Sequence, residues 1–466
     1  MKIIHYSLLA SCILSSTLFA SIDADSSLSQ DHTYENKIEK KPDIQIVDGW
    51  EFSGDIRTGW VQYEYQNAPT GIDLGGNIIP TNPNTNKGHI DSKGLYVMPK
   101  ISITSPKNSR IGAKVTLGGA TDFGLNDEKY GTRTFVFDPA KRKSYIILQE
   151  VYLKYEDKNH KLLAGREELS TPMIDADDWY MFSNSFELAY YAYKALEDIT
   201  IAGGYFSQMA GVWDSGADNS RGFDKTQFNS MSEVSYIDSA DKIAIGDKGI
   251  YTVTFMYNDD RNHNVQVWDY YAEDMYNTLF IQYDYTNKIA GFSYDAGLQF
   301  INFKEVGYLS TAAAKTEEID YSIYSARFDG NFDFGFNFAT GVAKFTDGSG
   351  QGTTLGAFGG YPYFANGMIF HFFEAGSLQN AASYKAQIGY DILDNLWLGY
   401  RYTYFDLDPN FSKNANGQAQ DAMKLNGIRL SYGGDKGTYF TGTYEDVNLD
   451  NEPNTYSLRL IGGYKF

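Results

Sequence analysis

Apolar and polar residues alternate along most of the chain from Trp50 onward. From Tyr456 to Phe466 the even positions hold Tyr, Leu, Gly or Phe, whereas Ser457, Arg459 and Lys465 occupy odd positions. Successive side chains of a β-strand point to opposite faces, so this period of two predicts a strand with one apolar face. The same period recurs at 279–285, 334–338, 396–404 and 428–432. The chain is therefore expected to be all-β.

The alternation divides the chain into eighteen predicted strands. They span residues 50–64, 93–104, 109–119, 144–155, 160–169, 186–194, 198–208, 249–257, 261–271, 275–286, 291–304, 320–329, 334–345, 380–390, 396–407, 422–432, 437–446 and 454–466. Short connections such as 156–159 alternate with mostly long ones such as 209–248 and 346–379. Outer-membrane barrels have an even number of antiparallel strands, short periplasmic turns and longer external loops. We therefore predict a transmembrane up-and-down β-barrel with both chain ends in the periplasm.

Two places do not fit this pattern easily. Met368–Glu374 resembles a strand, but counting it would break the alternation of connections, so we expect it to pack within the loop 346–379. Pro99 falls inside the second predicted strand, where its missing N–H removes a ladder hydrogen bond. We expect a β-bulge there.

The first twenty residues have the features of a secretory signal peptide. Lys2 precedes an apolar stretch from Ile3 to Leu18, and Ala20 is a small residue suited to cleavage. A lipobox-like Leu9–Cys12 is the alternative interpretation of this region. We predict a signal peptide at 1–20, a polar periplasmic extension at 21–49 and the barrel at 50–466.

The composition excludes several classes of site. The single cysteine lies in the predicted signal peptide, and the six histidines show no metal-binding spacing. Residues 446–457 only loosely resemble a calcium loop, because the glycine and the bidentate glutamate are missing. No cofactor or metal is therefore expected. A net charge of −20 argues against nucleic acid and anionic lipid surfaces as partners.

A barrel of this size implies an aqueous pore. In hydrocarbon every backbone polar group needs a partner, so only helices or closed sheets span. No segment after residue 20 approaches the ~18 consecutive apolar residues of a spanning helix. Barrels of about 16–18 strands enclose a channel, whereas smaller ones are filled by side chains.

One segment resembles a known family. Gly165–Pro172 reads GREELSTP and is followed by Phe186 and Glu187. This is similar to the OprD-type porins of the Gram-negative outer membrane, and Tyr464 and Phe466 resemble the terminal aromatic signal read by the barrel-assembly machinery. The resemblance implies an eighteen-stranded barrel, often a homotrimer in outer-membrane lipid. It also implies that the third external loop, residues 170–185 here, folds into the lumen and constricts the pore.

Two sets of charged residues are candidates for selectivity. The face opposite the apolar one points into the lumen, which places five arginines there: Arg57, Arg327, Arg401, Arg429 and Arg459. The family resemblance adds Arg166 and implies a luminal row of basic residues that guides carboxylate-bearing solutes. The alternative is that luminal arginines simply pair with luminal acids such as Asp55, Glu150 and Asp284.

The second set is acidic and lies in the third external loop. Asp175, Asp177 and Asp178 would raise the local cation concentration if they faced a narrow lumen. We predict that neutralising all three lowers cation preference.

The sequence therefore favours a porin for passive diffusion of small hydrophilic solutes and ions. A substrate-specific channel or a surface adhesin on the same barrel is the alternative. An enzyme is not expected, because no nucleophile with a positioned base is visible. A soluble secreted β-protein is a further alternative. The strict alternation of short and long connections argues against it, because a soluble fold does not require that alternation.

Overall fold

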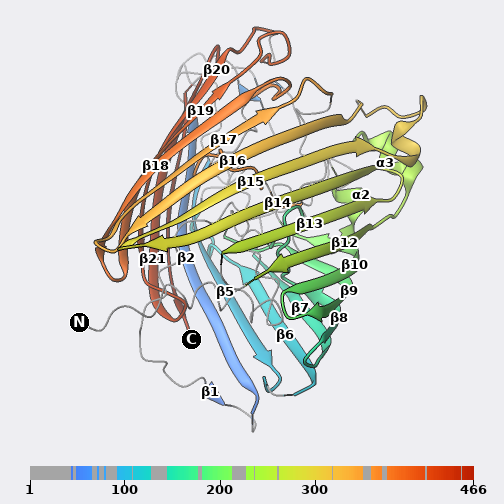
Figure 1. Ribbon diagram of the computed structural model, residues 1–466, viewed down its shortest axis with the longest axis vertical. Coiled ribbons are helices and arrows are strands. Elements are labelled where there is room, and N and C mark those ends of the chain that lie inside the picture. The colour runs from blue at the N-terminus through green and yellow to red at the C-terminus, as the bar shows by residue number, and fades with distance from the viewer. Residues whose placement is uncertain are drawn as a thin grey trace.

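The structure is a computed structural model, and most of its described residues form the wall of a single β-barrel (Figure 1). It describes residues 44–45, 49–65, 71–72, 78–79, 92–107, 109–126, 144–176, 181–211, 227–235, 237–259, 262–316, 318–349, 358–360, 362–369, 375–414, 417–452 and 454–466. The predicted signal peptide and most of the predicted extension 21–49 lie outside this set.

Eighteen long antiparallel strands form the described wall. They are β2 (Glu51–Tyr65), β5 (Ser92–Thr104), β6 (Ile111–Ala120), β7 (Tyr145–Glu156), β8 (His160–Glu167), β9 (Ser185–Leu196), β10 (Ile199–Ala210), β12 (Ile250–Asn258), β13 (His263–Ala272), β14 (Tyr276–Ile289), β15 (Phe292–Glu305), β16 (Asp320–Phe332), β17 (Phe336–Phe345), β18 (Ala382–Leu393), β19 (Leu396–Asp406), β20 (Ala422–Tyr432), β21 (Gly437–Leu449) and β22 (Thr455–Lys465). Each corresponds to one predicted strand, so the predicted strand count and fold class are confirmed.

Short elements accompany the wall. The two-residue strands β1 (Ile44–Gln45) and β11 (Asn229–Ser230) pair with β2 and β10, and β3 (Gly71–Ile72) pairs with β4 (Ile78–Ile79). Helices α2 (Met231–Val234), α3 (Ser239–Ile245) and the 3₁₀ helix η1 (Gly307–Ser310) lie in external connections.

The first and last long strands close the barrel. β2 pairs with β5 on one side and with β22 on the other, for example through Trp60 opposite Leu460. The terminal Phe466 completes this seam, because its N–H donates to the Gly54 carbonyl at 2.9 Å and its carbonyl accepts from Gly54 at 3.0 Å. No wall strand is left with a free edge among those described, as a membrane barrel requires.

The prediction of a β-bulge at Pro99 is wrong. Ile56 stands opposite Pro99 with no register shift between β2 and β5. On the other side, regular pairing with β6 begins at Lys100 opposite Gly118, and a bridge from Val97 to Thr121 continues the same register. The missing N–H therefore interrupts the ladder without inserting a residue.

The two faces of the wall differ as the sequence pattern predicts. On β7, Ile146 and Leu153 point outward and are 78% and 65% exposed, whereas Ile147 and Gln149 are buried inside. An exposed aliphatic and aromatic outer surface matches the hydrocarbon that surrounds a membrane barrel. None of the helices in the described residues is long and apolar enough to cross a membrane.

External loops are fastened to one another. The Asp241 carboxylate on α3 accepts hydrogen bonds from the backbone N–H groups of Lys315 at 2.9 Å and Thr316 at 2.5 Å. Burial alone would raise the pKa of Asp241, but these bonds and that of the Thr316 hydroxyl outweigh it and hold the pKa below its usual range.

Candidate channel lining and pore constriction

The connection between β8 and β9 turns into the barrel directly after the strand. Gly165 has φ +135°, and a Cβ there would collide with the carbonyl of Val151, so glycine is required at this turn of the backbone. Beyond it, Thr171 accepts a hydrogen bond from the Tyr270 hydroxyl at 3.0 Å, and Ile174 is fully buried. The loop is thereby fixed to the inner wall at β13.

The long connection between β17 and β18, called the second loop below, meets the third external loop inside the barrel. The Phe358 N–H donates to the Met173 carbonyl at 2.7 Å, and the Asp175 N–H donates to the Phe358 carbonyl at 3.0 Å. These backbone bonds join the two loops in a short strand-like contact. Phe358, Tyr363 and Ile174 belong to the same buried apolar cluster as Trp268 of β13.

Side chains of the opposite inner wall hold the second loop by its backbone. The Glu445 carboxylate on β21 accepts the N–H groups of Met368 at 2.7 Å and Ile369 at 2.6 Å. Arg401 donates to the Gly367 carbonyl at 2.8 Å, and Arg429 donates to the Met368 carbonyl at 3.1 Å. Residues 358–360 and 362–369, called segment 358–369 below, therefore reach from the third external loop to β19–β21.

The sequence contained a signal for this arrangement. Met368–Glu374 was expected to pack within the loop 346–379, and Met368 and Ile369 are indeed buried there. The remainder of that segment lies outside the described residues. Sequence reasoning missed that this loop meets the third external loop, because nothing local specifies a contact between distant segments.

Two predicted luminal arginines are neutralised by carboxylates, as the pairing alternative expected. Arg57 forms an ion pair with Asp55 at 3.2 Å, and Arg327 forms one with Asp284 at 2.8 Å. Arg327 also lies over the ring of Phe364 from the second loop, 4.9 Å from its centroid.

The other predicted arginines have different positions. Arg401 and Arg429 point inward and hold the second loop, and Arg459 is inward on β22 and 7% exposed. Arg166 lies elsewhere. It stands opposite Val151 and continues the outward row of Leu162 and Ala164, so it faces away from the lumen. Glu150 pairs with Lys114 at 2.8 Å rather than with an arginine.

Sequence reasoning overlooked Lys385. Because Tyr384 and Ile388 of β18 are outward, Lys385 is inward, and the register places it across Gly341 from Arg327. The backbone of Phe364 from the second loop lies against Gly341, because a Cβ there would be 2.6 Å from the Phe364 carbonyl oxygen and 3.4 Å from the Lys385 Cε. Within the described part of the chain, Lys385 has no hydrogen-bond or ion-pair partner, unlike the neighbouring arginines. The alternation of β18 was the signal that could have identified it.

The loop acids are only partly described. Asp175 is 7% exposed, and its carbonyl accepts a hydrogen bond from Asn184 at 3.0 Å. Asp177 and Asp178 lie outside the described residues. No group of three or more His, Cys, Asp or Glu side chains in the described segments is arranged to hold a metal ion.

Comparisons with known proteins agree on the architecture. No protein-family model and no curated protein sequence matches the chain. Solved structures do. The Pseudomonas aeruginosa channel OccK9 (OpdG) has a TM-score of 0.68 at 12% identity over 91% of this chain and 100% of its own. A BenF-like porin from Pseudomonas fluorescens has a TM-score of 0.66 at 14% identity over 91% and 100%. Pseudomonas aeruginosa OpdK, solved with vanillate, has a TM-score of 0.65 at 12% identity over 89% and 98%. The chain has the fold of the OprD-type porins.

Within this OprD-type fold, the segment that carries the sequence resemblance shapes the third external loop. Arg166 and Glu187, both part of it, form an ion pair at 3.2 Å that joins the ends of β8 and β9. Gly165 lies two residues before the end of β8, and Thr171 fixes the loop that follows to β13. The resemblance therefore coincides with the residues that turn this loop into the barrel.

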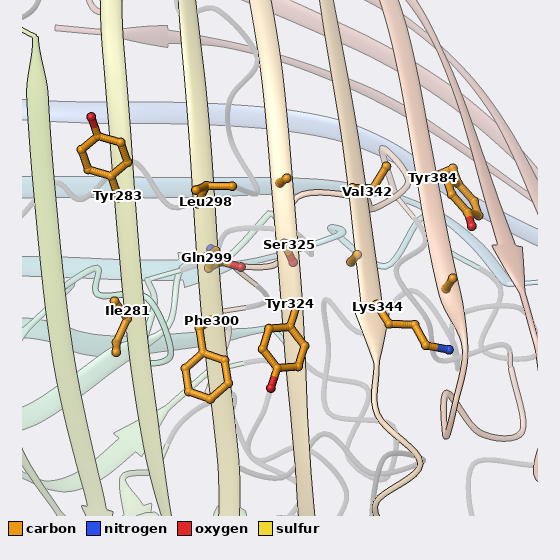
Figure 2. Close-up of a pocket in the computed structure, with 13 residues that line it drawn as sticks. Ile281, Tyr283, Leu298, Gln299, Phe300, Tyr324, Ser325, Val342, Lys344 and Tyr384 are labelled. Carbon is orange, nitrogen blue, oxygen red and sulfur yellow. The ribbon is translucent and has the colours of Figure 1, made fainter.

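One groove of this OprD-type barrel is not part of its lumen. It is about 680 Å³ and lies on the outer wall, where Tyr283, Phe300, Tyr324 and Tyr384 of four different strands surround it (Figure 2). Tyr324 and Tyr384 are 53% and 48% exposed on the outward face. The groove therefore belongs to the lipid-facing surface and offers no route for a solute.

Proposed function

We propose that the chain is an outer-membrane porin through which small hydrophilic solutes and ions diffuse passively. Support comes from the closed eighteen-stranded wall, its apolar exterior and its similarity to solved porins. The conduit is narrowed by the third external loop, 170–185, together with segment 358–369 of the second loop. The contact between Met173 and Phe358 supports this, because it brings both loops together inside the wall.

We further propose that the channel favours solutes that carry a carboxylate. The observation that carries this is Lys385, an inward lysine that forms no hydrogen bond or ion pair within the described residues and lies near Arg327, Arg401 and Asp329. Neighbouring arginines are already bonded to acids or to loop carbonyls, so Lys385 is the basic side chain that we expect to meet an anionic solute. The neighbour OpdK was solved with vanillate, an aromatic carboxylate.

The test is ion selectivity in planar bilayers together with vanillate uptake into liposomes. We expect Lys385→Gln to shift the reversal potential toward cation preference and to slow vanillate entry by about tenfold, because a focused charge raises local solute concentration. Lys344→Gln is the matched control, since Lys344 lies on the adjacent strand but faces outward. Equal behaviour of the two variants would contradict the carboxylate preference.

The loop acids provide the opposite expectation in the same assay. If Asp175, Asp177 and Asp178 govern selectivity, the wild-type channel prefers cations and the triple Asn variant loses that preference. A cation-selective wild type that responds to this triple variant and not to Lys385→Gln would replace the carboxylate proposal with the acidic one.

The proposal extends to assembly. The predicted signal peptide 1–20 would export the chain, and the terminal Tyr464 and Phe466 would be read by the barrel-assembly machinery of a Gram-negative cell. The ring centroids of Tyr464, near the end of β22, and Phe466, directly after it, are 6.4 Å apart on the seam that closes the barrel. A homotrimer in outer-membrane lipid is part of the same proposal.

A further inference from the structure

An ion pair occupies the outer wall, where an apolar surface is expected. Arg166 of β8 stands opposite Glu187 of β9, and the two are joined at 3.2 Å. Both continue the outward rows of their strands, which include Ala164 and Ala189. The inward neighbours Leu163 and Phe186 are buried, so the ion pair faces the membrane side.

The ion pair lies in a groove, near the external ends of β8 and β9. The groove is about 580 Å³, and Leu148, Val151, Ala189 and Tyr205 contribute apolar surface to it. Arg166 is the second residue from the external end of β8, and Glu187 is the third residue of β9 from the same side. The ion pair therefore lies near the external ends of β8 and β9. Ala189 and Tyr205 extend from it along the wall, whereas Leu148 of β7 lies on its external side.

The guanidinium is held in a fixed orientation. Phe228, which precedes β11 in an external loop, covers its face at 4.0 Å from ring centroid to Arg166 Cζ. The Glu187 carboxylate accepts a hydrogen bond from the Nε atom of Arg166 alone. Within the described residues, no acceptor is bonded to the two terminal Nη atoms. Arginine positioned in this way presents a planar pair of donors that matches the oxygens of a phosphate.

Lipid tails alone do not explain this site. A charged side chain on the lipid face of a barrel costs about 2–4 kcal/mol at the bilayer centre and little near the boundary. The ligand that fits is therefore an amphiphile with an anionic group at the external boundary and an acyl chain directed inward along the wall. The net charge of −20 argues against broad attraction to anionic surfaces, but a single oriented guanidinium is a local contact.

We propose that this groove binds a phosphorylated lipid of the outer leaflet, with the phosphate on Arg166 and an acyl chain against Ala189 and Tyr205. The inference rests on the outer-membrane location proposed above, but not on the solute that the channel passes.

Native mass spectrometry of the full-length detergent-solubilised protein with lipid A tests it. Lipid A is an acylated diglucosamine that carries two phosphates, and its dephosphorylated form is the matched probe. We expect one bound lipid A per chain, and about tenfold weaker binding for Arg166→Gln, because a hydrogen bond to a charged group is lost. Ala189→Trp should also weaken binding, because the larger side chain fills the groove.

Arg110→Gln is the control, because Arg110 is an exposed arginine in the turn that precedes β6, at the opposite rim. Equal loss in Arg110→Gln and Arg166→Gln, or equal binding of dephosphorylated lipid, would overturn the proposal. The proposal would also be overturned if the wild type were an oligomer in the absence of lipid and Arg166→Gln dissociated it. A second copy of the chain would then cover the groove. Conductance of the same preparations separates this result from the porin proposal: a wild type without conductance would refute the porin and leave the lipid site standing.

Discussion

An inward position does not by itself leave a cation free to meet a solute. Arg401 and Arg429 point into the barrel, yet their guanidinium groups are bonded to carbonyls of the second loop. Arginine has five donors in a rigid fork and readily bridges wall and loop, whereas lysine is a compact charge on a flexible stem. At the residue scale, this difference separates the residues that hold the loops from Lys385, which we expect to meet solute.

Gly165 gives a prediction at the same scale. We expect Gly165→Ala to destabilise the barrel by about 1–3 kcal/mol, because φ of +135° is strained for alanine and its Cβ would meet the Val151 carbonyl. Thermal unfolding in detergent measures this effect. Gly462→Ala is the control, since its nearest neighbour would lie 3.4 Å from the new Cβ. Equal midpoints for the two variants would show that the turn tolerates a side chain.

Which residues point inward could be predicted, but their partners could not. Period-two alternation is a local property, so it predicts an inward side chain at Arg57, Arg327, Arg401, Arg429 and Arg459 without saying what each one contacts. Arg166 came from family resemblance in a stretch where the alternation is weak, and the structure places it outward. Lys385 was within reach of the same alternation and was missed only because arginines alone were considered.

At the scale of elements, strands and loops differ in how much local sequence decides. Each of the eighteen predicted strands corresponds to a strand of the wall, although the ends differ by up to three residues, as for β14, which ends at Ile289. The path of segment 358–369 depends on Glu445 and Arg401, which are distant in sequence. The loop contact therefore could not be derived from the pattern, and Pro99 was misjudged because a ladder can lose one bond without changing register.

Glu445 offers the test at this scale. It is fully buried and holds two backbone N–H groups of the loop, each worth about 1.5–3 kcal/mol when the acceptor is charged. We expect Glu445→Ala to release segment 358–369 and raise single-channel conductance, and Glu445→Gln, which keeps one acceptor, to have a smaller effect.

Asp446→Ala is the neighbouring control for this experiment. Asp446 belongs to the outward face and accepts a hydrogen bond from Asn426 at 3.2 Å, so its loss should leave the loop in place. An unchanged conductance in Glu445→Ala would mean that segment 358–369 does not narrow the conduit.

For the whole molecule, the decisive feature is the seam between the first and last strands. Strand pairing between neighbours in sequence would also occur in an open sheet, but pairing of β2 with β22 occurs only in a closed one. Closure removes the free edges, because the first and last strands then pair with each other as hydrocarbon demands. The channel proposal depends on this seam more than on any one side chain.

Engineered cysteines test the seam and its register together. Thr58 stands opposite Gly462, and directly opposed residues of antiparallel strands lie about 4.5–5.5 Å apart, within the range of a disulfide. We expect Thr58→Cys with Gly462→Cys to cross-link readily under oxidation, as a mobility shift in non-reducing electrophoresis. The native Cys12 lies in the predicted signal peptide and would not compete after cleavage. Thr58→Cys with Ile461→Cys is the control, because a one-residue offset moves the second thiol to the opposite face. Equal cross-linking of both pairs would indicate a slipping or open seam, and the barrel could not then enclose a continuous aqueous path.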